Sequence, residues 1–369
     1  MNKPQPPLQQ RDDDHPDFGI IGHQASWRDI VSIVNNIRED KTNPISEDDI
    51  KSIFPYFPPR SMFNIEVTST YSAEKINGKY IETFISPDSL TTKGNTKENL
   101  EKVNQAARVA IRHNIPISAL GGFTSIVLEG NIDLLPPDQR SKFTTGNTLT
   151  AALIAKGIVE ATALLGLDLK KSNVLILGAT GDIGSACTHY FKDSVKRLFL
   201  VARNYKRLSQ LRDELRLSSS EISIHSEAFT PQADIVIAAT SSTEMQLSDL
   251  KPTVLLVDAG YPKNLRSECL PRTAHLFYGG MGFVRGGYSS TPDYHRHFYC
   301  FPYPNIAHGC ILEAIVLAFE RRHEAFSANR GKITNAKMKE ILSLSEKHGI
   351  VLAPFYNDKG LWSIQKDKT

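Results

Sequence analysis

A strand, a glycine-rich turn and a helix are expected in immediate succession in the segment VLILGATGDIGS, residues 174–185. Glycines here allow a tight turn and a close approach of backbone N–H groups to a diphosphate, and the helix N-terminus adds further donors. The spacing is G-x-x-G-x-x-G rather than G-x-G-x-x-G, so the glycines alone could mark an ordinary turn. A second strand at 198–201 favours a dinucleotide site instead. We predict cofactor contacts from Gly178, Thr180, Gly181, Asp182, Ile183 and Gly184.

Short aliphatic runs alternate with helical segments from residue 173 onward, at 174–177, 198–201, 222–224, 235–238, 254–257 and 276–278. This alternation is typical of a doubly wound parallel sheet with buried strands. The fold class is therefore α/β. We expect a disordered tail over 1–17, an N-terminal α/β substrate domain over 18–168, a Rossmann-type NADP-binding domain over 169–304 and a C-terminal helical segment over 305–369.

The substrate domain shows both helical and strand periodicity. Strands are expected at 18–21 and 63–69, and helices at 27–37 and 96–113, the latter capped by Asn95. The pair Asn77-Gly78 predicts a tight hairpin turn before a strand at 79–85.

Composition excludes several classes of protein. The 43 Lys and Arg residues nearly balance 40 Asp and Glu, which gives no electrostatic footprint for nucleic acid. Four cysteines are too few for a disulfide framework and favour a reducing, cytoplasmic compartment. The longest apolar stretch, 151–167, carries Lys156 and Glu160, so we expect a buried helix and no integral membrane segment.

Basic residues follow the second strand, where an NAD site carries an acidic residue. Arg203 and Arg207 suit the 2′-phosphate of NADP, and we predict further cofactor contacts from Ala202 and Asn204. The sequence therefore predicts NADPH; the alternative is a solvated basic helix start.

The fourth and fifth strands end in loops that should wall the nicotinamide pocket, because ligands bind at the carboxyl ends of such strands. We predict cofactor contacts from Thr240 and Gly260. Lys263 is either a substrate or cofactor contact or a structural residue.

Cys310 is the candidate nucleophile, since it begins a helix whose dipole would lower the thiol pKa and whose free N–H groups could hold an oxyanion. A small buried hydrophobic role is the alternative. Cys187 is expected to pack in the core. The residue types that bind zinc also gather within sixteen residues, at His295, His297, Cys300, His308 and Cys310. Their spacing matches no compact zinc motif, so no metal is expected.

Several segments together are similar to one family: FGIIGH (18–23), GKYIET (78–83), ISALGGFTSI (117–126), FTTGNT (143–148) and GYPKNL (260–265). The chain resembles the long-chain acyl-(acyl-carrier-protein) reductases of cyanobacteria over residues 18–350. The resemblance implies NADPH-dependent reduction of a fatty acyl thioester on acyl carrier protein to a fatty aldehyde. It also implies a nucleophilic cysteine before a C-x-x-E-A helix, which Cys310 matches.

Further roles stay open. Thr144, Thr145 and Asn147 either line the reacting centre or serve the turn, and His308 is either a proton donor or a helix cap. Residues 279–304 depart from the family pattern, which leaves acyl length and a fatty-acid or polyketide carrier open. Basic residues at 321–339 could receive the acidic carrier or form a solvated face, and an aldehyde-consuming enzyme is a further possible partner.

Two other functions remain compatible with the sequence. One is an NADP-dependent alcohol or ketone oxidoreductase of the shikimate-dehydrogenase type, which needs no cysteine. The other is a non-catalytic carrier-binding or NADP-sensing module.

Overall fold

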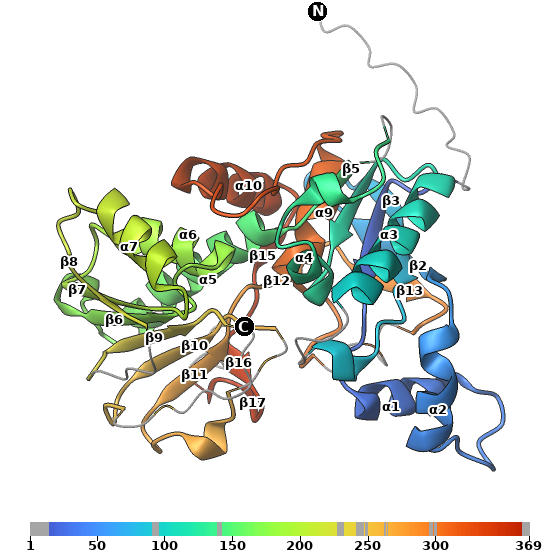
Figure 1. Cartoon of the computed structure of the whole chain (residues 1–369), viewed down its shortest axis with the longest axis horizontal. Coiled ribbons are helices and arrows are strands. Elements are labelled where there is room, and N and C mark those ends of the chain that lie inside the picture. Colours follow the sequence, from blue (N-terminus) through green and yellow to red (C-terminus); the bar gives the residue numbers. More distant parts are fainter. Residues whose placement is uncertain are drawn as a thin grey trace, which may run out of the picture.

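The computed structural model of the chain describes residues 15–90, 96–138, 142–226, 232–240, 247, 250–261, 263, 265–294, 298 and 301–363. Two six-stranded sheets form two lobes, with helices between and around them (Figure 1). Most of the tail expected over 1–17, and the expected cap Asn95, lie outside the described residues.

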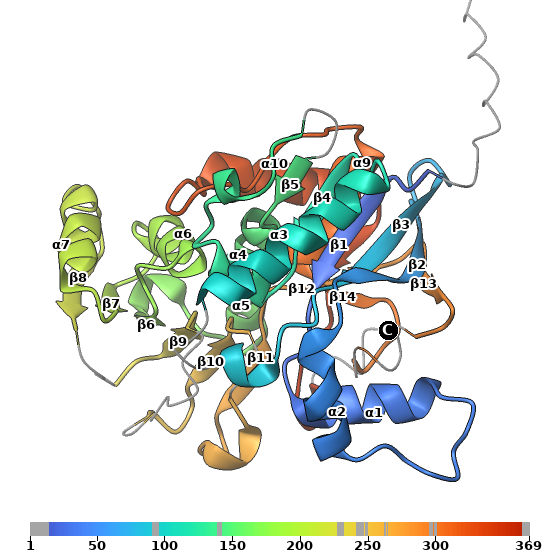
Figure 2. The same cartoon turned by 45° about the vertical axis from the view of Figure 1, so that its right-hand side comes forward.

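The first sheet is mixed, with strand order β13-β2-β3-β1-β4-β5. Its strands are β1 (Phe18–Gly22), β2 (Arg60–Thr68), β3 (Lys75–Glu82), β4 (Ile117–Leu120), β5 (Lys142–Thr144) and β13 (Tyr288–Thr291). The accompanying helices are α1 (Trp27–Ile37), α2 (Glu47–Ile53), α3 (Thr96–Arg112) and α4 (Phe123–Val127). Helix α3 lies across this sheet (Figure 2).

The predicted turn at Asn77-Gly78 is wrong. Both residues lie inside β3, and the chain reverses earlier, between β2 and β3. Gly78 is paired with Phe18 of β1, and a Cβ at Gly78 would come within 2.3 Å of the Phe18 ring. The glycine therefore serves close packing within the sheet rather than a turn.

The second sheet is parallel throughout, with order β11-β10-β9-β6-β7-β8. Its strands are β6 (Asn173–Leu177), β7 (Arg197–Val201), β8 (Glu221–His225), β9 (Ile235–Ala238), β10 (Leu255–Asp258) and β11 (His275–Tyr278), with helices α6 (Asp182–Phe191) and α7 (Tyr205–Glu214). Reading from β8, this is the Rossmann order 3-2-1-4-5-6. The predicted α/β class and doubly wound parallel sheet are confirmed.

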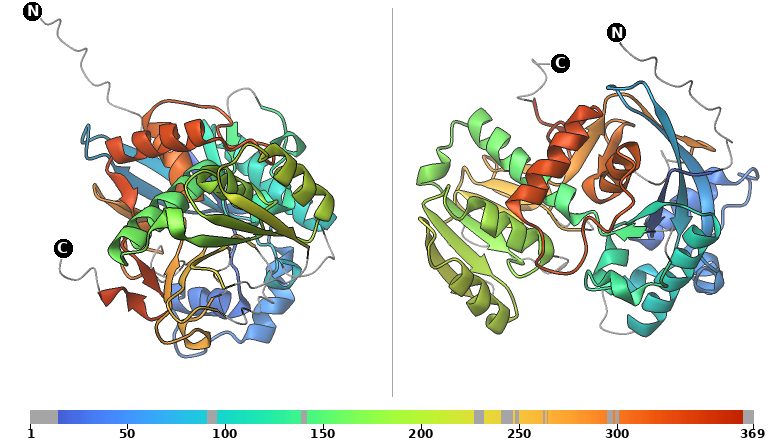
Figure 3. Two further views of the ribbon diagram at one scale, coloured as in Figure 1. Left: turned by 90° about the vertical axis from the view of Figure 1, so that its left-hand side faces the viewer. Right: turned by 90° about the horizontal axis from the view of Figure 1, so that it is seen from above.

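Three helices join the lobes: α5 (Asn147–Leu164), α9 (Gly309–Phe319) and α10 (Asn335–Lys347). Helix α5 contributes Ala151 and Ala155 to the core around the second sheet and Leu149 and Leu153 to the core around the first. From above, α10 lies between the two lobes (Figure 3). No helix of the described residues has both the length and the apolar character needed to cross a membrane.

The last part of the chain holds strands as well as helices. It contains β14 (Ile306–His308), β15 (Ile350–Leu352), β16 (Tyr356–Asn357) and β17 (Gly360–Leu361), and β12 (Met281–Val284) pairs with β14 and β15. The chain also returns to the first sheet through β13, which pairs with β2. The domain boundaries expected from the sequence stay a prediction.

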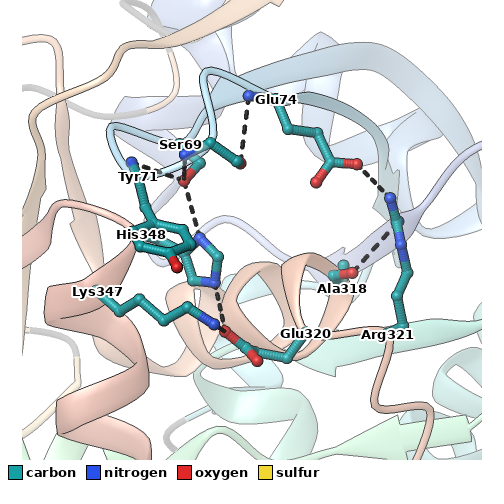
Figure 4. A network of polar contacts seen from close by, with 9 residues as sticks. Ser69, Tyr71, Glu74, Ala318, Glu320, Arg321, Lys347 and His348 are labelled. Atoms are coloured by element: carbon teal, nitrogen blue, oxygen red, sulfur yellow. Dashed lines mark hydrogen bonds and ion pairs between the residues drawn. The ribbon is translucent and has the colours of Figure 1, made fainter. Parts of the chain in front are cut away.

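The C-terminal end of α9 is held by a polar network (Figure 4). His348 is hydrogen-bonded through Nδ1 to Ser69 Oγ at 2.8 Å and through Nε2 to Glu320 at 2.6 Å, and Lys347 pairs with the same carboxylate. Ser, His and Glu in series are also the residue types of a hydrolytic triad. Here Ser69 and His348 are only 1% and 3% exposed, so the network can anchor α9 but cannot reach a substrate.

Candidate active site

A cavity of about 500 Å³ lies between the carboxyl edge of the second sheet and the beginning of α9. Residues far apart in the sequence therefore face one space. Its lining includes most of the predicted site residues: Gly178, Thr180, Gly181, Asp182, Ile183, Ala202, Arg203, Asn204, Arg207, Thr240, Gly260, Asn147, Lys263, His308 and Cys310.

The glycine loop after β6 is packed too closely for side chains. Gly178 has φ +80°, and a Cβ there would come within 2.3 Å of the Ala239 carbonyl oxygen. Gly184 does not line the cavity; a Cβ on it would come within 2.2 Å of the Gly178 carbonyl oxygen. The first-turn amides of α6 have no acceptor inside the helix and face this loop. The bare backbone cradle fits a diphosphate.

Asp182 uses its side chain to join three segments. Its carboxylate accepts from Asn147 Nδ2 at 3.2 Å and from the Gly331 N–H at 2.9 Å. Its predicted cofactor contact would therefore come from the backbone N–H.

The basic turn after β7 also borders the cavity. Arg203 and Arg207 are exposed and line it. Asn204 caps α7 by accepting from the Arg207 N–H at 3.0 Å. This placement fits a phosphate on the adenosine ribose.

Cys310 lies in the first turn of α9 and lines the cavity. The backbone N–H groups of Gly122 and Ile311 act to lower the pKa of its thiol. Burial nevertheless raises the pKa of the thiol, and the nearby Glu313 carboxylate adds to this effect. The expectation of a lowered pKa is therefore wrong, because desolvation outweighs the helix N-terminus.

The turn that supplies the Gly122 amide is fixed by His23. Gly122 has φ +54° and ψ −119°, and the next amide, Phe123 N–H, donates to His23 Nε2 at 2.8 Å. The other ring nitrogen, Nδ1, lies 3.2 Å from the Gln24 carbonyl oxygen and must carry the hydrogen. Burial lowers the pKa of His23 to about 4, so the ring is neutral at neutral pH.

Two aromatic contacts connect this turn to His308. The Tyr261 ring lies edge-on to His23 and to His308, with centroid distances of 5.4 and 5.5 Å. His308 occupies the N-cap position of α9, but its side chain makes no capping hydrogen bond. Burial, together with Lys263 and His23, lowers the pKa of His308 to about 3.

Lys263 bridges two strand ends. Its Nζ donates to the carbonyl oxygens of Asp258 and Gly279, each at 2.9 Å, and burial lowers its pKa. It therefore holds together the loops after β10 and β11 while lining the cavity.

Thr144 and Thr145 are buried and absent from the cavity lining among the described residues. The Thr144 hydroxyl donates to Glu313 at 2.5 Å. The Glu313 carboxylate also accepts from the Leu149 N–H and the Ser327 hydroxyl, both at 2.9 Å. The two threonines thus belong to a hydrogen-bond network that fixes the beginning of α5 against α9.

The remaining candidates differ in accessibility. Cys187 is fully buried, as predicted, and Cys269 is exposed. His295, His297 and Cys300 lie outside the described residues, within which no three His, Cys, Asp or Glu side chains could hold a metal ion.

Several of the basic residues between 321 and 339 already have partners. Arg321 pairs with Asp17 and Glu74, and Arg322 pairs with Glu324 and Glu340. These ion pairs leave less positive charge for an acidic partner than the sequence indicates.

Sequence reasoning missed four residues at this site: Gly122, His23, Tyr261 and Arg330. Arg330 was considered only as part of a basic surface, yet it lines the cavity. The segments FGIIGH, GGFT and GYPKN contain the other three, but nothing in their spacing places them beside Cys310.

Comparisons with known proteins point to one reductase over nearly the whole chain. A long-chain acyl-[acyl-carrier-protein] reductase from Synechococcus elongatus is 34% identical over 353 residues, which cover 90% of this chain and 97% of that protein. Aminotransferase PigE from Serratia sp. is 27% identical over 64% of this chain and 28% of its own length. Residues 159–275 match the family Shikimate / quinate 5-dehydrogenase.

A solved structure, shikimate 5-dehydrogenase from Listeria monocytogenes in complex with shikimate and NAD, covers 74% of this chain and 89% of its own. Its TM-score is 0.34 and its identity 11%.

Proposed function

This chain belongs to the long-chain acyl-[acyl-carrier-protein] reductase family and is an oxidoreductase; from that premise we propose that it reduces a fatty acyl thioester on acyl carrier protein to a fatty aldehyde with NADPH. The supporting observation is the shared cavity. The Cys310 sulfur, the glycine loop and Arg203 all line it, so a dinucleotide and an acylated cysteine can meet there.

Cys310 forms the acyl-enzyme. Its sulfur attacks the thioester carbonyl carbon, the bond from that carbon to the carrier sulfur breaks, and the carrier thiol leaves with a proton. The N–H groups of Gly122 and Ile311 stabilise the Cys310 thiolate as it forms, since both act to lower the pKa of the thiol.

NADPH, when bound, supplies the hydride that reduces the acyl group. Residues 178–184 hold its diphosphate, Arg203 and Arg207 its 2′-phosphate, and Thr240 and Gly260 the wall of the nicotinamide pocket. Asn147 and Lys263 fix the surrounding loops through Asp182 and through the strand ends.

His308 transfers the proton. It lines the cavity two residues before Cys310 and is neutral at neutral pH because burial lowers its pKa to about 3. A neutral imidazole passes the thiol proton on to the departing carrier sulfur as the new C–S bond forms and the old one breaks, and its low pKa keeps it from retaining that proton. Collapse of the reduced adduct then releases aldehyde and regenerates Cys310.

Intact-mass spectrometry after incubation with acyl carrier protein, without NADPH, tests the proposal. We expect one acyl group on the wild type and on Cys269→Ser, whose thiol is exposed and outside the cavity lining, and none on Cys310→Ser. Near-normal turnover of an alcohol or ketone by Cys310→Ser would instead favour a shikimate-dehydrogenase-like reaction. NADPH binding without any adduct would favour the carrier-binding module.

A further inference from the structure

Arg330 reaches the cavity from the segment between α9 and α10, outside the second sheet. It lines the same space as the glycine loop. The residues on either side of it are pinned by their backbones: the Asn329 N–H donates to the Gly130 carbonyl at 2.8 Å, and the Gly331 N–H donates to Asp182 Oδ1 at 2.9 Å. The second bond fixes the segment to the first turn of α6.

The charge of Arg330 is only weakly engaged by its ion-pair partner. The Glu129 carboxylate lies 3.6 Å from the Arg330 guanidinium. The side chain of Glu129 is 71% exposed and that of Arg330 is 37% exposed. An exposed ion pair of this kind contributes little to stability, so a more strongly charged ligand can displace it.

The glycine loop itself brings no positive side chain to a diphosphate. Between Gly178 and Gly184 the only charged residue is Asp182, whose carboxylate is negative. A cationic side chain from another segment would therefore add to the α6 amides in binding a diphosphate. Arginine offers a planar pair of donors that matches two phosphate oxygens.

We propose that Arg330 binds the diphosphate of the dinucleotide from the segment bonded to Asp182, beside the glycine loop. This inference rests on the proposed function only in taking the ligand to be a dinucleotide. It assigns Arg330 to the diphosphate and leaves the 2′-phosphate to Arg203. The Asn329 N–H is also bonded to the Gly130 carbonyl oxygen. Through this bond the segment around Gly130, which follows α4 beside the first sheet, supports the residue that binds the cofactor.

Equilibrium titration of the full-length protein with NADPH and NADH, followed by fluorescence, tests the assignment. Arg330→Met should weaken both cofactors by the same factor, about 10- to 100-fold, because both carry the diphosphate. Competition by 2′-AMP, which has no diphosphate, should be unchanged in Arg330→Met and weakened in Arg203→Met. Arg330→Lys should lie between wild type and Arg330→Met.

Lys332→Met is the matched control, since Lys332 is exposed in the same segment and absent from the cavity lining; its titrations should equal those of the wild type. Unchanged NADPH affinity in Arg330→Met, with a raised KM for the acyl carrier, would overturn the inference and assign Arg330 to carrier docking. If the wild type forms the acyl adduct and binds NADPH, but both Arg330 variants bind NADPH as tightly as the wild type, this inference alone is overturned. A wild type that binds no NADPH would overturn the proposed function with it.

Discussion

Gly146 lies directly against the backbone of Cys310. A Cβ on Gly146 would come within 2.1 Å of the Cys310 carbonyl oxygen and 2.3 Å of its Cα. Gly146 precedes α5 with φ +68°, and Cys310 lies in the first turn of α9, so two helices begin in backbone contact at the nucleophile. The position of the Cys310 sulfur therefore depends on Gly146, which has no side chain and lies just before α5.

Gly146→Ala should displace Cys310. We expect acyl-adduct formation, measured by quenched-flow mass spectrometry, to fall at least about tenfold, and the free energy of unfolding to fall by about 1–3 kcal/mol. Gly166→Ala is the control, because Gly166 has the same φ of +68° with nothing within 4 Å of an added Cβ. It should lose stability without losing adduct formation; equal losses in both variants would show that backbone strain alone is responsible.

Arg203→Asp should change cofactor preference. Removing the cation and adding a carboxylate repels the 2′-phosphate but not a ribose hydroxyl. We expect the Kd for NADPH to rise about 100-fold or more while the Kd for NADH changes less than about threefold. Equal weakening of the two cofactors in the titration would contradict the assignment.

Glu313→Leu should destabilise the protein by about 2–4 kcal/mol, because it leaves the buried Leu149 N–H and the hydroxyls of Thr144 and Ser327 without their shared acceptor. Urea unfolding followed by circular dichroism measures this. Thr144→Val removes one of the three donors and should cost less. A Glu313→Leu protein as stable as the wild type would mean that these donors find other partners.

His23 should make the fold sensitive to mild acid. Burial lowers its pKa to about 4 from an ordinary value of 6.5, so below pH 6.5 the unfolded chain takes up a proton that the folded protein refuses. Stability therefore falls by about 1.4 kcal/mol per pH unit from this residue between pH 6.5 and 4. His23→Gln lacks this contribution, so its stability deficit relative to the wild type should shrink by about 2 kcal/mol between pH 7.5 and 5 in urea titrations. A constant deficit would show that the folded protein accepts the proton.

Alkylation of Cys310 should keep accelerating at high pH. Burial raises the thiol pKa above its ordinary value of 9.0, and only the thiolate reacts. In the cofactor-free protein, the rate with iodoacetamide should rise about tenfold per pH unit up to pH 9, with Cys310→Ser giving the background. A plateau below pH 8 would show that the helix N-terminus outweighs desolvation.

The fold was largely predictable, whereas the surroundings of the nucleophile were not. Mostly apolar runs of three or four residues located every strand of the second sheet, because burial on both faces leaves such a signal in most of these strands. Gly78 misled the prediction, since a glycine gives the same local signal whether it turns the chain or makes room for Phe18. The contact of Gly146 with Cys310 joins residues far apart in the chain, and no local pattern encodes such a pair.

The pKa of Cys310 and the hydrogen bond of His23 were harder still to predict from the sequence. A helix N-terminus predicts a low thiol pKa only while water surrounds it, and burial depends on the whole assembly around Cys310. His23 is one polar residue after an apolar strand in the sequence, and its bond to the Phe123 amide follows only from the adjacency of β1 and β4.

The pairing of β13 with β2 has a consequence for synthesis on the ribosome. Residues 64–67 pair with residues 288–291. The first sheet therefore cannot gain its edge strand β13 until all strands of the second sheet have been translated. The parallel sheet, contiguous in the chain from β6 to β11, can fold as it emerges. The part of the protein that is begun first is thus finished last, and the helix carrying Cys310 is translated only after the glycine loop is already in place.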